Sequence, residues 1–344
     1  MNVPKHILVI RLSAMGDVAM TVPVLQAFRR NYPKVKLTIV SKGFFAPIFK
    51  EIPGINFVEA AVQKEHKGVL GLLQLARQLK GLDIDAVADL HNVIRSKIIS
   101  KYLKFQGIKS ATIDKGRAEK KAIIRAKGSN LNPIKTTHER YADVFRSLGF
   151  EMELQPPVFP KRKTIPLSLQ EKVKKSSKKW VGMAPFAAYE SKSYPLSMIE
   201  KVIESLLALG NYEVFLFGGG TKEATQLEAV AQKYDGVVSI AGTLSFEEEL
   251  ALISNLDGML AMDSGNGHLA ALYGIPVITL WGVTHPATGF TPFNQPLENQ
   301  LLADRTQYPM IPTSIYGNKY PEGYEKAIVS IKPETIVQKI SERF

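Results

Sequence analysis

The fold is decided first by residues 6–31, HILVIRLSAMGDVAMTVPVLQAFRRN. Residues 6–12 are a short, mostly apolar run rich in β-branched side chains, which is typical of a strand buried on both faces. A glycine-containing connection follows, and apolar residues then recur at helical spacing over residues 18–31. A strand that runs directly into a helix begins a βαβ unit, so this stretch predicts a parallel sheet covered by helices.

The same alternation continues along the chain. Further strands are expected at residues 35–41, 56–59, 85–90 and 111–114, and further helices at 68–79, 95–104 and 137–148. After a Pro-containing basic stretch at 161–179 the pattern restarts, with strands at 180–184, 213–217, 237–241, 258–262 and 276–281 and helices at 196–209, 221–234, 246–254 and 267–272. The sequence therefore predicts an α/β protein with two Rossmann-like doubly wound parallel-sheet domains, 1–160 and 161–344. Residues 284–324 are expected to form a long ordered loop, and 333–344 a last helix.

The composition of the 344-residue chain excludes several function classes. It contains no Cys, which rules out disulfides, thiolate metal sites and cysteine nucleophiles. The six His residues show no paired spacing for a metal site. No run approaches the roughly 20 apolar residues of a membrane helix, and the start does not read as a signal peptide. These features predict a cytoplasmic protein without a metal or cofactor.

The positive charge lies in one half of the chain. Residues 1–160 hold 26 Lys and Arg against 13 Asp and Glu, whereas residues 161–344 hold 18 against 19. A polyanion, an anionic membrane surface or a phosphorylated substrate could each be the partner. Residues 92–140 are the most basic part, with only Tyr102 and Phe105 as aromatics, so a nucleic acid is disfavoured. A lysine-rich solubilising face remains the alternative.

The connection after the first strand is the first candidate site. Ser13, Gly16 and Asp17 lie there, and ligands of open α/β sheets bind at the carboxyl ends of strands. Gly16 lets backbone approach a ligand closely, and Asp17 would lie at the mouth of the crevice. The alternative is that Asp17 merely caps the following helix.

A second candidate site follows the strand at 258–262. Small and polar residues gather there at a strand-to-helix junction: Asp263, Ser264, Gly265, Asn266, Gly267 and His268. Free N–H groups at a helix start, a hydroxyl and an imidazole are the groups that a phosphate or diphosphate needs. A turn with a capping Asp and a core-facing His is the alternative.

Other motifs are weaker. The glycine-rich residues 217–223 match neither a P-loop nor a dinucleotide fingerprint, and Glu223 could contact a ribose or base or simply favour a helix start. Lys192, in the loop over 184–195, could neutralise a phosphate or be a solvated side chain. Asp83 and Asp85 form an acidic pair that can hold a metal, but they open a strand and so lie at the wrong edge of the sheet.

Taken together, these segments resemble glycosyltransferase family 9, the ADP-heptose:lipopolysaccharide heptosyltransferases. The resemblance extends over about residues 5–290 and rests on six segments in family order: 7–23, 89–96 (DLHNVIRS), 138–141 (HERY), 192–195 (KSYP), 263–268 (DSGNGH) and 273–276 (YGIP).

This resemblance implies a GT-B fold, with an N-terminal acceptor domain and a C-terminal nucleotide-sugar domain facing it across a crevice, and a last helix that packs back on the first domain. It implies an inverting, metal-independent transfer of a heptose or related sugar, with Asp17 as general base. Lys192 would bind the donor phosphates, Glu223 the nucleoside, and the diphosphate would lie against Asp263, Ser264, Gly265, Asn266, Gly267 and His268.

The implied partners are an ADP-heptose donor and an anionic lipid A inner-core acceptor, met by a monomer at the inner face of the inner membrane. Acceptor-side candidates are Ser13, Gly16, Arg95, Lys97, Arg117, Lys120 and Lys121. Two other functions stay open: a GT-B-type sugar-nucleotide epimerase or isomerase, which needs no acceptor, and a non-catalytic basic module that binds a polyanion or a membrane.

Overall fold

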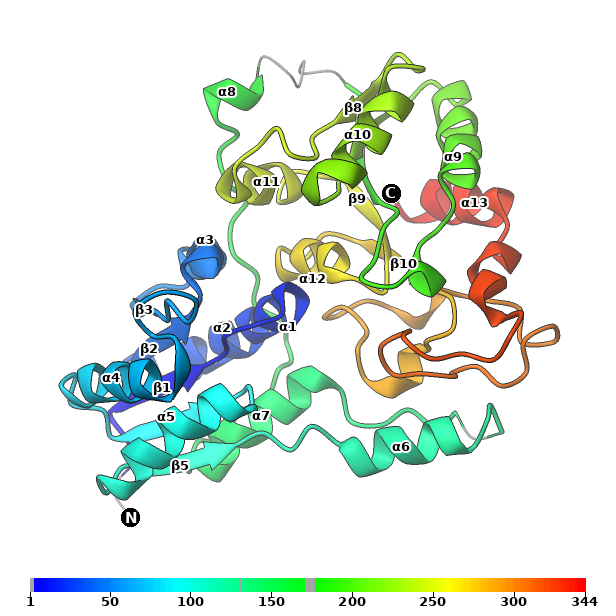
Figure 1. Cartoon of the computed structure of the whole chain (residues 1–344). Coiled ribbons are helices and arrows are strands. Elements are labelled where there is room, and N and C mark those ends of the chain that lie inside the picture. The colour runs from blue at the N-terminus through cyan, green and yellow to red at the C-terminus, as the bar shows by residue number, and fades with distance from the viewer. Residues whose placement is uncertain (1–2, 130, 171–176) are drawn as a thin grey trace. The chain divides into compact units, whose positions relative to one another are not determined.

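The chain divides into two compact units in the computed structural model, which describes residues 3–129, 131–170 and 177–344 (Figure 1). The first unit comprises Met1–Gly116 and Lys135–Pro160, and the second comprises Arg117–Ile134 and Lys161–Phe344. A short excursion of the N-terminal half, containing α6 (Arg117–Arg125), therefore belongs to the second unit. Within the described ranges, no helix combines the length and apolar character that crossing a bilayer requires.

The first unit is built on a five-stranded parallel sheet of order β3-β2-β1-β4-β5. Its strands are β1 (His6–Ile10), β2 (Lys36–Ser41), β3 (Ile55–Glu59), β4 (Ala86–Asp89) and β5 (Lys109–Thr112). Its helices are α1 (Met15–Ala19), α2 (Thr21–Asn31), α3 (Ala46–Phe49), α4 (Gly68–Lys80), α5 (Ile94–Phe105) and α7 (Thr137–Ser147), with a 3-10 turn η1 (Gly43–Phe45).

Helices cover both faces of this sheet. Leu8 and Ile10 of β1 point into a core formed with α4 and α5, to which Leu75 and Ile99 contribute. On the other face α2 packs against α7, and the Phe28 ring centroid lies 4.9 Å from that of Phe145. Both faces of β1 are buried, as the apolar run predicts.

The second unit holds a six-stranded parallel sheet of order β11-β10-β9-β6-β7-β8. Its strands are β6 (Lys179–Ala184), β7 (Tyr212–Leu216), β8 (Val237–Ser239), β9 (Gly258–Met262), β10 (Val277–Trp281) and β11 (Gln300–Leu302). Its helices are α6, α8 (Leu167–Gln170), α9 (Leu196–Ala208), α10 (Gly220–Ala231), α11 (Phe246–Ile253), α12 (Gly265–Leu272) and α13 (Pro333–Arg343), with 3-10 turns η2 (Glu190–Lys192), η3 (Pro286–Thr288), η4 (Leu297–Asn299) and η5 (Tyr324–Ser330). Two doubly wound parallel sheets confirm the predicted fold class.

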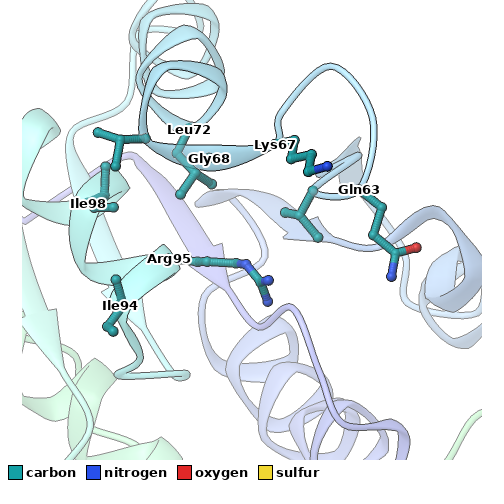
Figure 2. A pocket seen from close by; sticks show the side chains of 9 residues that line it. Gln63, Lys67, Gly68, Leu72, Ile94, Arg95 and Ile98 are labelled. Carbon is teal, nitrogen blue, oxygen red and sulfur yellow. The ribbon is translucent and has the colours of Figure 1, made fainter.

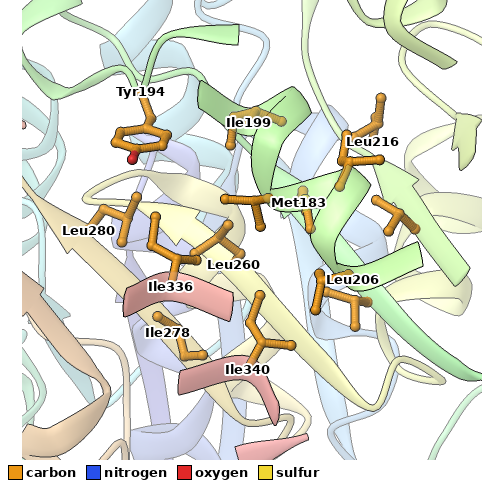
Figure 3. Close-up of a cluster of buried hydrophobic side chains, with 14 of the residues drawn as sticks. Met183, Tyr194, Ile199, Leu206, Leu216, Leu260, Ile278, Leu280, Ile336 and Ile340 are labelled. Atoms are coloured by element: carbon orange, nitrogen blue, oxygen red, sulfur yellow. The ribbon is translucent and has the colours of Figure 1, made fainter. Parts of the chain in front are cut away.

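The last helix is part of the second unit's core. Ile336 and Ile340 of α13 lie against the sheet residues Leu260 and Ile278 (Figure 3), and α13 packs beside α9. Ile336 and Ile340 recur one helical turn apart, so the apolar face of α13 is buried within its own unit. The expected packing of this helix on the first domain stays a prediction.

Three local predictions also differ from the structure. The helical pattern over residues 18–31 is interrupted at Met20 and forms two helices, α1 and α2. The strand expected at 111–114 lies at Lys109–Thr112. The long loop over 284–324 contains η3, η4 and an edge strand, β11, which pairs with β10 over only a few residues and so leaves no visible period in the sequence.

Candidate functional site

In the first unit, the connections after β1 and β4 are neighbours at the point where the strand order reverses. β1 pairs with β2 on one side and with β4 on the other. Open α/β sheets bind ligands at such a switch point, outside the carboxyl ends of the strands. Asp17 follows β1 and lies in the first turn of α1, with Gly16 beside it and Ser13 in the preceding connection, all three partly buried.

Asp17 is held by an ion pair with Arg11. Its Oδ2 lies 2.7 Å from Arg11 Nη2, and the side chain of Arg11 is 5% exposed while that of Asp17 is 31% exposed. Asp17 Oδ2 also accepts a long hydrogen bond of 3.4 Å from the N–H of Ala14, the N-cap of α1. Helix capping and orientation by Arg11 thus act on the same oxygen. Among the described residues nothing hydrogen-bonds Oδ1.

Arg11 is itself fixed by two further contacts. Its Nη1 donates to the Leu90 carbonyl at 2.7 Å, which links the connections after β1 and β4. Its guanidinium lies over the Tyr141 ring, 5.7 Å from the centroid, and the Tyr141 hydroxyl donates to the Asp17 carbonyl at 3.2 Å. A carboxylate placed by so many contacts keeps one orientation, which is what general-base catalysis requires.

Asp89 shapes the connection after β4. It is fully buried and its carboxylate accepts hydrogen bonds from the N–H groups of His91 and Asn92, both at 2.9 Å, and from the hydroxyl of Ser96 at 3.0 Å. Burial, reinforced by the charge of Arg11, lowers the pKa of His91 to about 3. The neutral imidazole accepts a hydrogen bond from the Leu12 N–H at 3.4 Å. This segment therefore supports the loop that carries Asp17.

In the second unit the strand order reverses between β6 and β9, and the two connections there hold Lys192 and Asp263. Lys192 Nζ donates to the Asp263 carbonyl at 2.7 Å and lies 3.2 Å from Asp263 Oδ2. Both side chains are largely buried, at 10% and 12% exposure. The structure thus places Lys192 beside the second sequence motif, at the edge of the sheet where ligands bind.

The aliphatic stem of Lys192 packs against Gly317. Gly317 has φ +84°, and a Cβ there would lie 2.7 Å from Lys192 Cγ. The Ser191 hydroxyl donates to the Gly317 carbonyl at 2.5 Å, which holds the two segments together. Only glycine fits this position without strain, which lets the stem of Lys192 pack directly on the turn at 317.

The start of α12 is the rest of this cluster. Ser264 is its N-cap, and among the described residues no partner is found for the buried Ser264 Oγ. Gly265 and Asn266 form the first turn and are partly buried, whereas Gly267 and His268 are buried. Exposed N–H groups at a helix start beside a lysine make an anion-binding arrangement.

Glu223 is engaged within its own loop. Its Oε2 accepts a hydrogen bond of 2.7 Å from the N–H of Gly219, the N-cap of α10. This contact matches the simpler of the two expectations for Glu223, a carboxylate that satisfies a helix start.

The structure separates the basic candidates into two groups. Arg95 and Lys97 lie on α5 of the first unit and are exposed. The remaining three lie on α6 of the second unit: Arg117, Lys120 and Lys121.

The α6 group lines a pocket of about 450 Å³ together with residues of the segment 313–319, including Lys319. Arg117 and Lys121 are exposed there, whereas Lys120 is buried with its Nζ 3.9 Å from the centroid of the Phe290 ring. This cation–π contact anchors α6 to the second unit.

Sequence reasoning missed Arg11, Tyr141 and Gly317 as site residues. Arg11 could have been found as a charged residue at the end of a buried strand. Tyr141 could have been found as the tyrosine of the HERY segment, and it is buried in the structure. Gly317 offered only an ordinary turn pattern, because its contact with Lys192 joins distant parts of the chain.

Among the residues that the structure describes, no group of three or more His, Asp and Glu side chains is arranged to hold a metal ion.

Comparison with known proteins gives consistent matches. A family model for glycosyltransferase family 9 (heptosyltransferase) matches residues 72–318. A lipooligosaccharide heptosyltransferase 2 from Haemophilus influenzae is 25% identical over 98% of this chain and 99% of its own length. A lipopolysaccharide heptosyltransferase 3 from Escherichia coli is 26% identical over 78% of this chain and 81% of its own.

Solved structures share the fold. A family 9 glycosyltransferase from Veillonella parvula has a TM-score of 0.76 at 17% identity, covering 98% of this chain and 96% of that one. An Escherichia coli heptosyltransferase solved with ADP has a TM-score of 0.70 at 18% identity, covering 98% of this chain and 100% of that one.

Proposed function

Since the chain belongs to glycosyltransferase family 9, the heptosyltransferases, and has their GT-B fold, we propose that it moves a heptose or related sugar from an ADP-sugar to an acceptor of the lipopolysaccharide inner core. The curated relatives are lipopolysaccharide and lipooligosaccharide heptosyltransferases that align over most of the chain. ADP is the nucleotide present in the similar Escherichia coli structure, which supports ADP-heptose as the donor.

Asp17 is the general base of the proposed reaction. The acceptor hydroxyl attacks the anomeric carbon from the face opposite the diphosphate, the bond from that carbon to the diphosphate oxygen breaks, and the hydroxyl proton passes to Asp17. Attack from the opposite face inverts the anomeric configuration. Two observations support this role: the Arg11 ion pair holds Oδ2, and Oδ1 has no hydrogen-bond partner among the described residues.

Lys192 and the start of α12 bind the leaving diphosphate in this proposal. Asp263 orients the ammonium of Lys192, and the free Oγ of Ser264 adds a donor. Together with the α12 N–H groups, they stabilise the charge that develops on ADP, so that the transfer proceeds without a metal ion. In an activity assay, a chelator then leaves the rate unchanged.

The basic side chains recognise the anionic acceptor. Arg95 and Lys97 on the first unit and Arg117 and Lys121 on α6 are exposed and project positive charge, which draws phosphate and carboxylate groups. We place the protein, as a monomer, at the inner face of the inner membrane, where such an acceptor is anchored. Light scattering on the purified chain tests the monomeric state.

The observation that carries the donor assignment is the buried Lys192–Asp263 pair beside the start of α12. A thermal-shift panel of ADP-, UDP-, GDP- and CMP-sugars tests it, because a bound ligand raises the melting temperature by mass action. We expect the ADP-sugars to give the largest shift, followed by release of ADP only when acceptor is added. Equal shifts with all four nucleotides, or no shift, would remove ADP-heptose as the donor.

The family match favours transfer over the sugar-nucleotide epimerase or isomerase and over a non-catalytic basic module. Incubation with the nucleotide sugar alone distinguishes a transferase from an epimerase or isomerase. Interconversion of the sugar without acceptor would favour the epimerase.

A further inference from the structure

Apolar side chains project into solvent where α4 and α5 begin. Leu70 is 83% exposed, Ile94 is 80% exposed and Val69 is 59% exposed. Val69 and Leu70 lie in the first turn of α4, and Ile94 is the first residue of α5. These helices follow β3 and β4 of the same parallel sheet and pack side by side, so both begin at its carboxyl edge.

A pocket of about 500 Å³ lies between the two helix starts, and Lys67 and Arg95 contribute the positive charge of its lining. Figure 2 shows the Arg95 side chain extending away from α5 into the pocket, with Lys67 across from it. The side chains of Lys67, Arg95 and Lys97 form no ion pair or hydrogen bond within the described parts of the chain, so their charge is available to a ligand. Both helix starts add the positive end of a dipole.

The charge around the pocket is almost wholly of one sign. Residues 60–72 and 93–101 hold five Lys and Arg and a single acid, Glu65. A protein partner of ordinary composition would not explain exposed isoleucine and leucine side chains set within a basic rim. An anionic lipid surface explains this combination. The apolar side chains enter the boundary between headgroups and acyl chains, and the Lys and Arg side chains contact the headgroups.

We propose that this surface, formed by Lys67, Val69, Leu70, Ile94, Arg95 and Lys97 and here called the docking patch, binds the protein to an anionic phospholipid bilayer. Leu70 and Ile94 insert at the interface, and Lys67 and Arg95 bind lipid phosphates from the pocket. The inference deepens the proposed function by naming the surface that meets the membrane carrying the acceptor. Docking through the carboxyl edge of this sheet brings the Asp17 edge of the first unit to the lipid.

Co-sedimentation with vesicles tests the docking patch on the full-length protein, without nucleotide sugar or lipopolysaccharide. The probes are vesicles of phosphatidylcholine alone and of an equal mixture of phosphatidylcholine and phosphatidylglycerol. The wild type is expected to bind the mixed vesicles, and Leu70→Ser with Ile94→Ser to weaken that binding by at least about tenfold, since two apolar side chains no longer leave water. Lys67→Gln with Arg95→Gln is expected to weaken it and to flatten its salt dependence.

Phe105→Ser is the matched control, because Phe105 is 88% exposed at the opposite end of α5. It removes an equally exposed apolar side chain and is expected to leave vesicle binding unchanged. Equal binding by the Leu70 and Ile94 double variant, an equal loss with Phe105→Ser, or a wild type that ignores anionic vesicles would each overturn the inference.

Failure of the docking patch is distinguishable from failure of the proposed function. Leu70 and Ile94 have no part in donor binding, so the double variant is expected to keep the wild-type thermal shift with ADP. A wild type that transfers sugar to a detergent-dispersed acceptor yet binds no anionic vesicle would overturn the docking patch alone.

Discussion

Each unit places a cation and a carboxylate together where its strand order reverses, but the two pairs differ in how deeply each member is buried. In the first unit the cation is the buried member: Arg11 is 5% exposed and Asp17 31%. In the second, Lys192 and Asp263 are buried about equally, and the ammonium also donates to the Asp263 carbonyl. The first pair leaves its carboxylate as the more exposed member, and the second places a cation beside a helix start.

The difference in burial indicates different roles for the two ion pairs, although the two units have similar folds. An arginine held by the Leu90 carbonyl and the Tyr141 ring is a support that orients Asp17. A lysine held by Asp263 and packed on Gly317 is, in the proposed reaction, a positioned charge for the donor diphosphate. Replacing Asp17 should therefore abolish proton transfer, and replacing Lys192 should weaken donor binding.

Replacing Asp17 with Asn is expected to produce the largest effect. The amide keeps the shape of the side chain but cannot accept the proton, so kcat should fall by about 100- to 10,000-fold. The thermal shift with ADP should be unchanged, because the groups proposed to bind the donor belong to the second unit. Initial rates of ADP release with saturating acceptor measure the loss.

Asp114→Asn is a control for removing a carboxylate from the first unit, since the Asp114 side chain is 88% exposed and lies 3.9 Å from Arg140. Its rate should remain close to that of the wild type. Wild-type transfer by Asp17→Asn would remove Asp17 as the base and with it the contrast between the two pairs.

Replacing Lys192 with Met should weaken ADP binding by about 10- to 100-fold, the value of a hydrogen bond between charged groups. Methionine fills the space of the stem but supplies no donor. Titration calorimetry with ADP measures the change. Lys233→Met, which breaks the more exposed pair with Glu200 in the same unit, should leave ADP affinity unchanged. A similar loss in both variants would point to general electrostatics rather than to a built phosphate site.

Local pattern predicted much of this arrangement, and long-range packing accounts for what it missed. A run rich in β-branched residues located β1 and a short apolar run located β9. Residues that follow parallel strands lie at one edge of the sheet, so Asp17 and Ser264 could be named. The pairing of Lys192 with Asp263 and the transfer of α6 to the second unit depend on contacts between distant residues, such as Lys120 with Phe290. The periodicity of apolar residues predicts local structure and does not predict such long-range contacts.

The two units also each bury a neutral histidine, which predicts a loss of stability in acid. Burial lowers the pKa of His91 to about 3 and that of His285 to about 4. Between pH about 6.5 and these values the unfolded chain binds protons that the native chain does not, so stability falls as the pH falls. Each histidine should cost about 2 kcal/mol by pH 5 and nothing above pH about 7.

Urea unfolding at neutral pH and at pH 5 measures this loss. His91→Asn and His285→Asn each retain an acceptor for the N–H that the imidazole Nδ1 serves, from Leu12 and Ala287 respectively. Each variant should reduce the acid loss. If the units unfold separately, each should change only one of two transitions. An unchanged pH dependence in both variants would assign the acid sensitivity to other groups.

The smallest expected effect is that of Gly317→Ala, which tests whether the Lys192–Asp263 pair depends on the turn at Gly317. Gly317 has φ +84° and Gly323 has φ +85°, so alanine at either position should cost about 1 kcal/mol of stability through backbone strain alone. A Cβ at Gly323 meets nothing within 4 Å, whereas at Gly317 it meets the stem of Lys192. Gly317→Ala should therefore also weaken ADP binding, by several-fold, because the ammonium is displaced from Asp263. Equal ADP affinity in the two variants, measured by calorimetry, would mean that Asp263 alone positions Lys192.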